Sequence, residues 1–280
     1  MEVISLQAIF LRFRWRMSLT FLLVVMEAAL GLLFPLLLGN AIDDLMAGTY
    51  LGLMLLAGLG IAMVIIGSAR RLYDTRVYSS IYRIVAAELV DRERRRQATL
   101  SRISARTGLL NEFVEFFENS MPEVVGALIS LVGILVILAS LSLPVLVGCV
   151  LLFLLVVLVY VVSGKLNYRL NAGYNSQLEQ QVGAISSPRP DRAATHFGRL
   201  MKWNIRLSDL ETVNYLVIWL GAIALLVFAP VAVVAGGALK YGVVLAVMMY
   251  VFDFIDWLVE LPLHVQQVIR LQEISRRLSR

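Results

Sequence analysis

Residues 124–162 read VVGALISLVGILVILASLSLPVLVGCVLLFLLVVLVYVV and contain no charged side chain. A helix of about 20 apolar residues crosses the ~30 Å hydrocarbon core of a bilayer. This segment is long enough to cross it twice, and Ser142 lies near its middle. It therefore predicts two membrane-spanning helices, over about 123–141 and 143–163, joined by a tight turn at Ser142.

Four further apolar stretches have a similar length and cover about 17–39, 50–68, 215–236 and 241–261. Of the 280 residues, 59% are hydrophobic and 16% are charged. Soluble domains have about 45–50% apolar and about 25% charged residues, and no soluble core of this size hides the difference. The sequence therefore predicts an all-α integral membrane protein with six transmembrane helices.

The composition also excludes several classes of function. The apolar excess argues against a disordered chain, a nucleic-acid-binding domain and an ordinary cytosolic enzyme. The single cysteine, Cys149, excludes a disulfide framework and a thiolate metal cluster, and the two histidines, His196 and His264, leave little for a zinc site. We therefore expect a protein that is not an enzyme and holds no cofactor or metal.

The basic residues indicate how the six stretches are oriented. Of the 25 Lys and Arg residues, 24 flank the stretches on one side, and Lys240 alone lies on the other. Cytoplasmic loops carry the excess of Lys and Arg. Both termini and the two long loops are therefore predicted to be cytoplasmic, with the protein in the inner membrane. The net charge of +5 then reflects topology and requires no nucleic acid partner.

The segments outside the membrane are expected to be mostly helical. The outer loops are very short, and apolar residues recur at helical spacing between Arg70 and Arg106. Spans two to five should therefore continue as helices far into the cytoplasm, with a turn at SSPRPDR, residues 186–192. Before the first span, alternating apolar and basic residues predict an interfacial elbow helix over 4–15.

The sixth span carries the densest set of acidic residues. Asp253, Asp256 and Glu260 are spaced i, i+3 and i+7, so they share one helix face, with Trp257 beside it. Clustered carboxylates in a low-dielectric cavity bind either a proton or a cation and hold both only weakly. That competition is the minimum chemistry of a proton-coupled cation antiporter, and aromatic neighbours offer cation–π contacts. The alternative is that these carboxylates pair with arginines of the second helix and hold the bundle together.

Further acidic residues mark the first and third helices. Glu27 lies ten residues into the first span, and Glu123 lies near the inner boundary of the third. Ionisable residues within spans are costly and are functional candidates by default. Glu115 and Glu118 precede the third span and are candidates for substrate entry or proton relay, with a solvated inner face as the alternative. Pro122 predicts a kink there.

Three segments resemble the transmembrane domain of type IV ABC exporters. They are LLFPLLLGNAIDDLM (32–46), SARTGLLNEFVEFFENS (104–120) and VIRLQEISRRL (268–278), and their order and spacing match those of the six-helix domains. The resemblance covers nearly the whole chain, so the whole of 1–280 is expected to form one such domain. It implies a homodimer or heterodimer of two six-helix chains, with domain-swapped helices, around a central cavity with alternating access. Of the two, we expect a homodimer.

The sequence departs from this family at two places. Gly164-Lys165 cannot belong to a P-loop, because Val159 stands where a glycine is needed and Leu166 stands where Ser or Thr would bind magnesium. We therefore expect a transmembrane domain that lacks a nucleotide-binding domain. In addition, the proline-containing segment 186–192 stands where the family carries a short helix that docks onto the ATPase.

Three functions remain open on these grounds. The first is an ATP-independent secondary transporter that exports organic cations, such as hydrophobic drugs or polyamines, in exchange for protons. The second is the transmembrane subunit of an ABC exporter whose ATPase is a separate chain. The third is a membrane scaffold that transports nothing. The expected partners are a second copy of the chain, a cationic small molecule, protons and membrane lipids.

Overall fold

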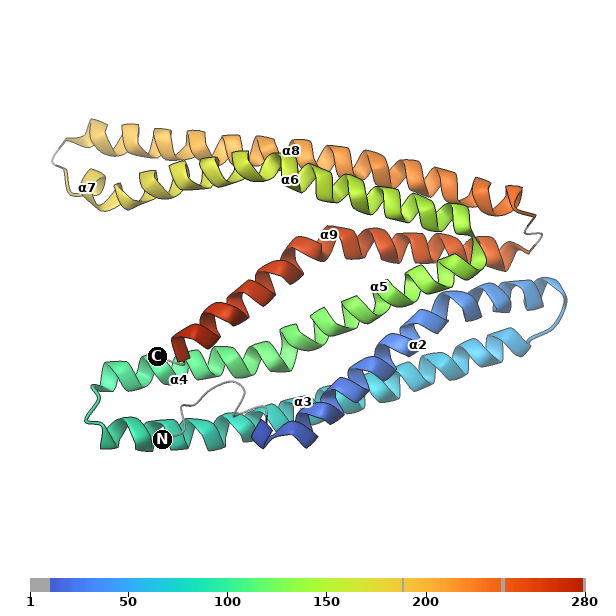
Figure 1. Cartoon of the computed structure of the whole chain (residues 1–280), viewed down its shortest axis with the longest axis horizontal. Coiled ribbons are helices and arrows are strands. Elements are labelled where there is room, and N and C mark those ends of the chain that lie inside the picture. Colours follow the sequence, from blue (N-terminus) through green and yellow to red (C-terminus); the bar gives the residue numbers. More distant parts are fainter. Residues whose placement is uncertain (1–10, 188, 238–239, 279–280) are drawn as a thin grey trace. The chain divides into compact units, whose positions relative to one another are not determined.

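In the computed structural model, the described residues are 11–187, 189–237 and 240–278. Every regular element within these ranges is helical (Figure 1). In chain order the elements are α2 (Arg14–Met46), α3 (Leu51–Arg95), α4 (Leu100–Glu115), the π-helix η1 (Phe116–Ser120), α5 (Met121–Leu141), α6 (Leu143–Glu179), α7 (Gln181–Ile185), α8 (Pro190–Ala235) and α9 (Tyr241–Leu278). Six helical stretches are long and apolar enough to cross a membrane, so the predicted fold class is confirmed.

The helices continue well past their apolar stretches, as expected. Helix α3 has 45 residues, α6 has 37 and α8 has 46. At 1.5 Å per residue α3 is about 68 Å long, more than twice the ~30 Å hydrocarbon core. The predicted turn at 186–192 separates α7 from α8, which begins at Pro190. Proline suits this first helical position because the amide it lacks would have no partner there.

Other sequence predictions stay predictions. The elbow helix at 4–15 falls largely outside the described residues. Contacts divide the chain into two compact units, one made of Met1–Ser142 with Val233–Arg280 and the other of Leu143–Ala232. One transmembrane domain over 1–280 and a domain-swapped dimer also stay predictions.

In the first unit, helix α2 is the central element and packs against α3, α5 and α9. Its inner end lies against the inner parts of α3 and α4. There Met17 of α2 is buried with Val77 and Ile81 of α3 and with Leu110 and Phe113 of α4. Burial of these side chains holds the three helices together here by the hydrophobic effect, worth about 1.5–3 kcal/mol for each fully buried aliphatic or aromatic side chain.

At the outer end of the first unit, α2 contacts the starts of α3 and α9. Gly39 and Gly242 touch through their backbones, and a side chain at either position would overlap the other chain segment. Two adjacent carboxylates then cap two different helices. Asp43 accepts a hydrogen bond from the Gly242 amide at 2.8 Å, and Asp44 accepts one from the Gly52 amide at 2.9 Å.

The second unit is a hairpin of α6 and α8 with the short helix α7 at its tip. Asn214 of α8 donates a hydrogen bond to Ser163 of α6 at 3.1 Å. Nearer the tip, Gln177 contacts the Nδ1 atom of the buried His196 at 2.9 Å. These polar contacts join the two helices of the hairpin.

Candidate functional site

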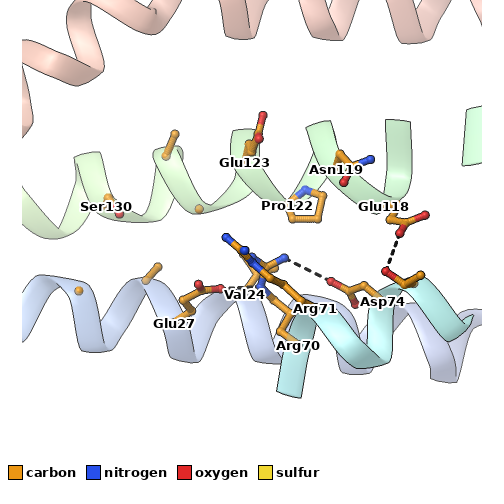
Figure 2. Close-up of a pocket in the computed structure, with 15 residues that line it drawn as sticks. Val24, Glu27, Arg70, Arg71, Asp74, Glu118, Asn119, Pro122, Glu123 and Ser130 are labelled. Carbon is orange, nitrogen blue, oxygen red and sulfur yellow. Dashed lines mark hydrogen bonds and ion pairs between the residues drawn. The ribbon is translucent and has the colours of Figure 1, made fainter. Parts of the chain in front are cut away.

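A charged pocket lies in the first unit among α2, α3, η1 and α5 (Figure 2). Its volume is about 610 Å³. Three of the acidic residues singled out from the sequence, Glu27, Glu118 and Glu123, line it. The second helix contributes Arg70 and Arg71, so the structure places acids of three helical segments around two arginines.

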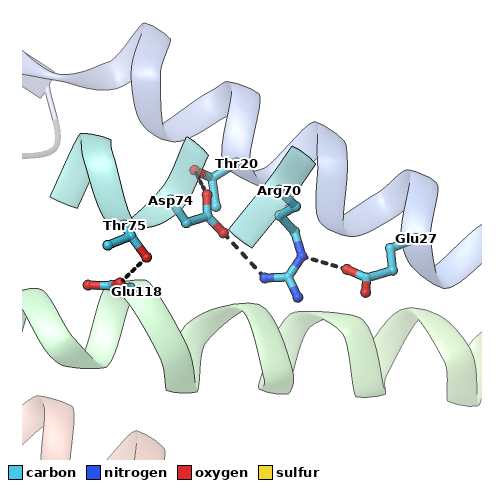
Figure 3. A network of polar contacts seen from close by, with 6 residues as sticks. All are labelled: Thr20, Glu27, Arg70, Asp74, Thr75 and Glu118. Atoms are coloured by element: carbon cyan, nitrogen blue, oxygen red, sulfur yellow. Dashed lines mark hydrogen bonds and ion pairs between the residues drawn. The ribbon is translucent and has the colours of Figure 1, made fainter. Parts of the chain in front are cut away.

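Arg70 stands at the centre of a polar network (Figure 3). Its Nε atom lies 2.5 Å from the Glu27 carboxylate of α2, and its Nη1 atom lies 3.2 Å from the Asp74 carboxylate one turn along α3. The other Asp74 oxygen accepts a hydrogen bond from the Thr20 hydroxyl of α2 at 2.7 Å. One guanidinium thus serves two carboxylates and joins α2 to α3.

Burial explains why this network needs all its members. Asp74 is only 2% exposed, and an ionised carboxylate without partners at such a site is strongly unfavourable. Gly67, one turn before Arg70, provides the space for Glu27, because a Cβ there would lie 3.3 Å from the nearer carboxylate oxygen. The small residue lets the Glu27 side chain lie flat against α3 and reach the arginine.

The third helix contributes to the pocket through a π-helical turn. Glu118 in η1 accepts a hydrogen bond from the Thr75 hydroxyl of α3 at 2.8 Å. Pro122 follows four residues later and has no amide hydrogen, so the Glu118 carbonyl loses the partner that an α-helix would provide. Wider π-helical turns occur at such points and are frequent at functional sites. The turn leaves α4, η1 and α5 continuous over Leu100–Leu141.

The other predicted residues lie elsewhere. Asp253, Asp256 and Glu260 are exposed on α9, and the structure gives them no ion pair with a Lys or Arg of the described residues. Glu260 lies 3.8 Å from His264, four residues further along. Arg70 pairs with Glu27 and Asp74 instead, so the alternative in which it anchors the sixth span receives no support within this chain. Glu115 is exposed on α4.

Trp257 belongs to a second, apolar pocket of about 250 Å³ between α5 and α9. Val124 and Leu128 of α5 and His264 of α9 also line it. The indole Nε1 of Trp257 and the Nε2 of His264 are buried there without a hydrogen-bond partner among the described residues. Trp257 therefore lies beside the carboxylates of α9, while its ring faces apolar side chains.

No cluster of three or more His, Cys, Asp or Glu side chains suited to a metal ion occurs in the described part of the chain. The polar groups that line the charged pocket are carboxylates, guanidinium groups, hydroxyls and the Asn119 amide. These groups bind protons, cations and anions.

The comparison with known families identifies the chain. Residues 6–242 match the family described as the ABC transporter transmembrane region, which is most of the chain. The protein belongs to this family. A comparison with curated proteins finds no match. Membership in this family and the six apolar helices make the protein an integral membrane component of a transporter.

Within this ABC transporter transmembrane region, three functional candidates were missed from the sequence. Thr20, Asp74 and Thr75 each bond to a charged residue of the pocket. Asp74 had a visible signal, since Arg70 and Asp74 are spaced i, i+4 on one helix face. Thr20 and Thr75 had none, because their partners lie 54 and 43 residues away in the sequence.

Proposed function

We propose that the protein is a secondary transporter that exports organic cations in exchange for protons and acts as a homodimer. The observation that supports this is the carboxylate face of α9. Asp253, Asp256 and Glu260 are exposed in a helix apolar enough to span a membrane. Charged side chains within spans face a bundle interior or a water-filled cavity rather than lipid. In this proposal a second copy of the chain forms the other wall of that cavity.

The chemistry of this face suits a cation that competes with protons. Three carboxylates on one helix face attract positive charge, and a cation bound there competes with protons for the same oxygens. Trp257 follows Asp256 and lines the adjoining apolar pocket, which in this proposal takes the apolar part of an organic cation. Hydrophobic cations and polyamines are therefore the proposed substrates, and proton binding on the opposite side of the membrane releases them.

A flux assay tests this proposal. The purified protein is placed in proteoliposomes with an imposed pH gradient, and uptake of ethidium or spermidine is followed. We expect flux that depends on the gradient and falls at least tenfold in Asp256→Asn and Glu260→Gln. Glu179→Gln, at the exposed end of α6, is the matched control and should transport normally. Flux that is absent, or that is unchanged in the two α9 variants, contradicts the proposal.

A second candidate is the transmembrane subunit of an ABC exporter with a separately encoded ATPase. Two observations favour it, namely the family match and the short helix α7. Helix α7 lies at the tip of the long α6–α8 hairpin, directly before residues 186–192, where the resemblance implies an ATPase-docking helix. Its Val182 side chain is 77% exposed, as a docking surface requires.

Co-purification distinguishes the two candidates. An ATPase that co-purifies with the wild-type chain and is lost in Val182→Glu supports the subunit function, particularly if transport then requires ATP. Transport that persists in liposomes holding this chain alone supports the secondary transporter. Absence of flux under both conditions favours a scaffold that transports nothing.

We also propose that the protein lies in the inner membrane with both termini in the cytoplasm. The support is the placement of 24 of the 25 Lys and Arg residues on one side of the spans. Cysteines placed at Gln97 and at Gly48, in a Cys149→Ala background, test this orientation. A membrane-impermeant thiol reagent applied to intact cells should modify the second position and spare the first.

A further inference from the structure

The charged pocket has two chemically different ends. One end carries the charged and polar side chains of α3 and η1. The other end runs between α2 and α5 and is lined by small residues, among them Ala28, Gly31, Gly126 and Ala127. A Cβ added at Gly31 would meet nothing within 4 Å, so this end is open space that a neighbouring side chain does not fill. The shape combines a polar compartment with an apolar cleft.

The depth of the pocket matches the inner part of the membrane. Arg70 follows the apolar stretch 50–68 by two residues, and Glu27 pairs with it. Basic residues at the end of a span reach the interface between hydrocarbon and water. The polar compartment therefore lies near this interface, and the cleft, which continues along α2 to Gly31, extends toward the bilayer centre.

The polar compartment has unmet charge of both signs. Arg70 is taken up by Glu27 and Asp74, whereas Arg71 has no hydrogen bond or ion pair among the described residues. Figure 2 shows the Arg71 guanidinium extending into the space between α2 and α5. On the opposite wall Glu118 uses one oxygen for Thr75, and Glu123 has only a 3.4 Å contact with Gln267.

The balance of charges restricts the ligand. Two arginines and four acidic residues line the pocket, so a purely anionic molecule meets net repulsion. A cation alone leaves Arg71 unpaired. A molecule with both charges satisfies both walls, because its anionic group pairs with the fork of Arg71 and its ammonium group pairs with Glu118 or Glu123.

We propose that this pocket binds a zwitterionic amphiphile whose headgroup carries a phosphate and an ammonium group, with an acyl chain in the small-residue cleft. Phosphatidylethanolamine has this chemistry, and so does any soluble phosphoethanolamine compound for the headgroup alone. The proposal is independent of the transport mechanism, since it uses the α2–α3–α5 pocket and none of the α9 carboxylates.

Native mass spectrometry of the purified full chain in detergent tests the headgroup. The probes are phosphatidylethanolamine and phosphatidylglycerol with identical acyl chains. We expect phosphatidylethanolamine to be retained at least fivefold better, and Arg71→Gln to reduce its retention roughly tenfold, as the loss of a charge-assisted bidentate contact predicts. Arg76→Gln is the matched control, because Arg76 is exposed on the same helix, donates a hydrogen bond to the Leu72 carbonyl and is not among the residues that line the pocket.

A second pair of variants tests the acyl cleft. Gly31→Leu fills the open space and should weaken retention of the lipid, while Gly58→Leu, also without neighbours within 4 Å but outside the pocket, should not. Competition by O-phosphoethanolamine separates the two sources of the headgroup. If it displaces the lipid, the headgroup alone is recognised and soluble zwitterions also bind; if it does not, the acyl chain is required and the ligand is a membrane lipid.

Two results would overturn the proposal. The first is equal retention of phosphatidylethanolamine and phosphatidylglycerol by the wild-type chain. The second is unchanged retention in both Arg71→Gln and Gly31→Leu when each variant elutes as the wild type does in size-exclusion chromatography.

Discussion

At the scale of single residues, the arrangement around Arg70 decides how two helices are held at the inner end of the membrane. Its guanidinium is shared by a carboxylate from α2 and one from its own helix, and the second carboxylate also receives the Thr20 hydroxyl. Such a network is stable only when complete, because the removal of one partner leaves buried charge without compensation. Neighbouring Arg71 has no ion pair among the described residues, so its substitution is the control for that of Arg70.

Substitution of Arg70 should therefore destabilise the protein far more than substitution of Arg71. Arg70→Ala leaves the 2%-exposed Asp74 beside Glu27 with no cation, and the expected loss in free energy of unfolding is roughly 3 kcal/mol. Arg71→Ala should change it by less than about 0.5 kcal/mol. Thermal unfolding in detergent measures both, and equal melting temperatures for the two variants would contradict the assigned role of Arg70.

A second residue contact predicts pH dependence near the N-terminus. The Arg12 guanidinium donates two hydrogen bonds to Glu88 and holds the pKa of that carboxyl below its ordinary value of 4.5. Because the pKa is lowered in the folded state, the contact stabilises above the ordinary value and is lost as the pH falls through the folded-state pKa. Hydrogen exchange of residues 11–16, corrected for intrinsic rates, should increase between about pH 6 and about pH 3. Glu88→Gln should show no such pH dependence; an identical profile would refute the contact.

The residue scale also marks a limit of sequence analysis. The acidic positions Glu27, Glu118 and Glu123 were identifiable because charge stands out against an apolar background. The partner of Glu27 was not, since Arg70 approaches it only through the packing of two antiparallel helices and the absence of a side chain at Gly67.

At the scale of helices, the sequence predicts well which segments are helical. It predicts poorly at which residue each helix begins and ends. The six spans and the continuation of the helices past the apolar stretches follow from hydropathy and helical spacing, which report burial in lipid and along a helix face. The ends depend on capping contacts from distant segments. Asp43 and Asp44 accept hydrogen bonds from amides at the starts of α9 and α3, and hydropathy does not report such contacts. The π-helical turn at 116–120 likewise left no pattern beyond Pro122.

The two caps allow a test of this helix-level role. Asp44→Ala removes the acceptor of the Gly52 amide at the start of α3 and should cost about 1 kcal/mol of stability, as other helix caps do. Asp43→Ala should act similarly at the start of α9. The matched controls are Asp43→Asn and Asp44→Asn, which keep a side-chain acceptor. Unfolding midpoints that do not separate the alanine variants from the asparagine variants would show that the caps contribute nothing.

At the scale of the whole molecule, the carboxylates of α9 distinguish one exposed membrane face from the others. Many apolar side chains on the spans are also exposed, Val64 on α3 being 69% exposed, and lipid accounts for them. Lipid does not account for Asp253, Asp256 and Glu260. The sequence predicted that these acids share one face of the helix. It did not predict whether that face would be exposed or packed against another helix.

Thiol accessibility distinguishes water from lipid at these two faces. In a Cys149→Ala background, Asp256→Cys should react with a charged thiol reagent in liposomes at least about tenfold faster than Val64→Cys, because the reactive thiolate forms only in contact with water. Cys149 itself is buried and contributes little background reaction. Equal slow rates at both positions would place the α9 face against lipid or a dry interface.

The contacts at Gly39, Asp43 and Asp44 carry a consequence for motion. They tie the outer ends of α2, α3 and α9 to one another through backbone contact and two amide hydrogen bonds. A change of conformation that separated these three ends would break all of them at once, whereas a rotation of the trio as one rigid body breaks none. Any opening at this end of the protein therefore occurs beside these three helices, and their joined ends move together as one rigid body.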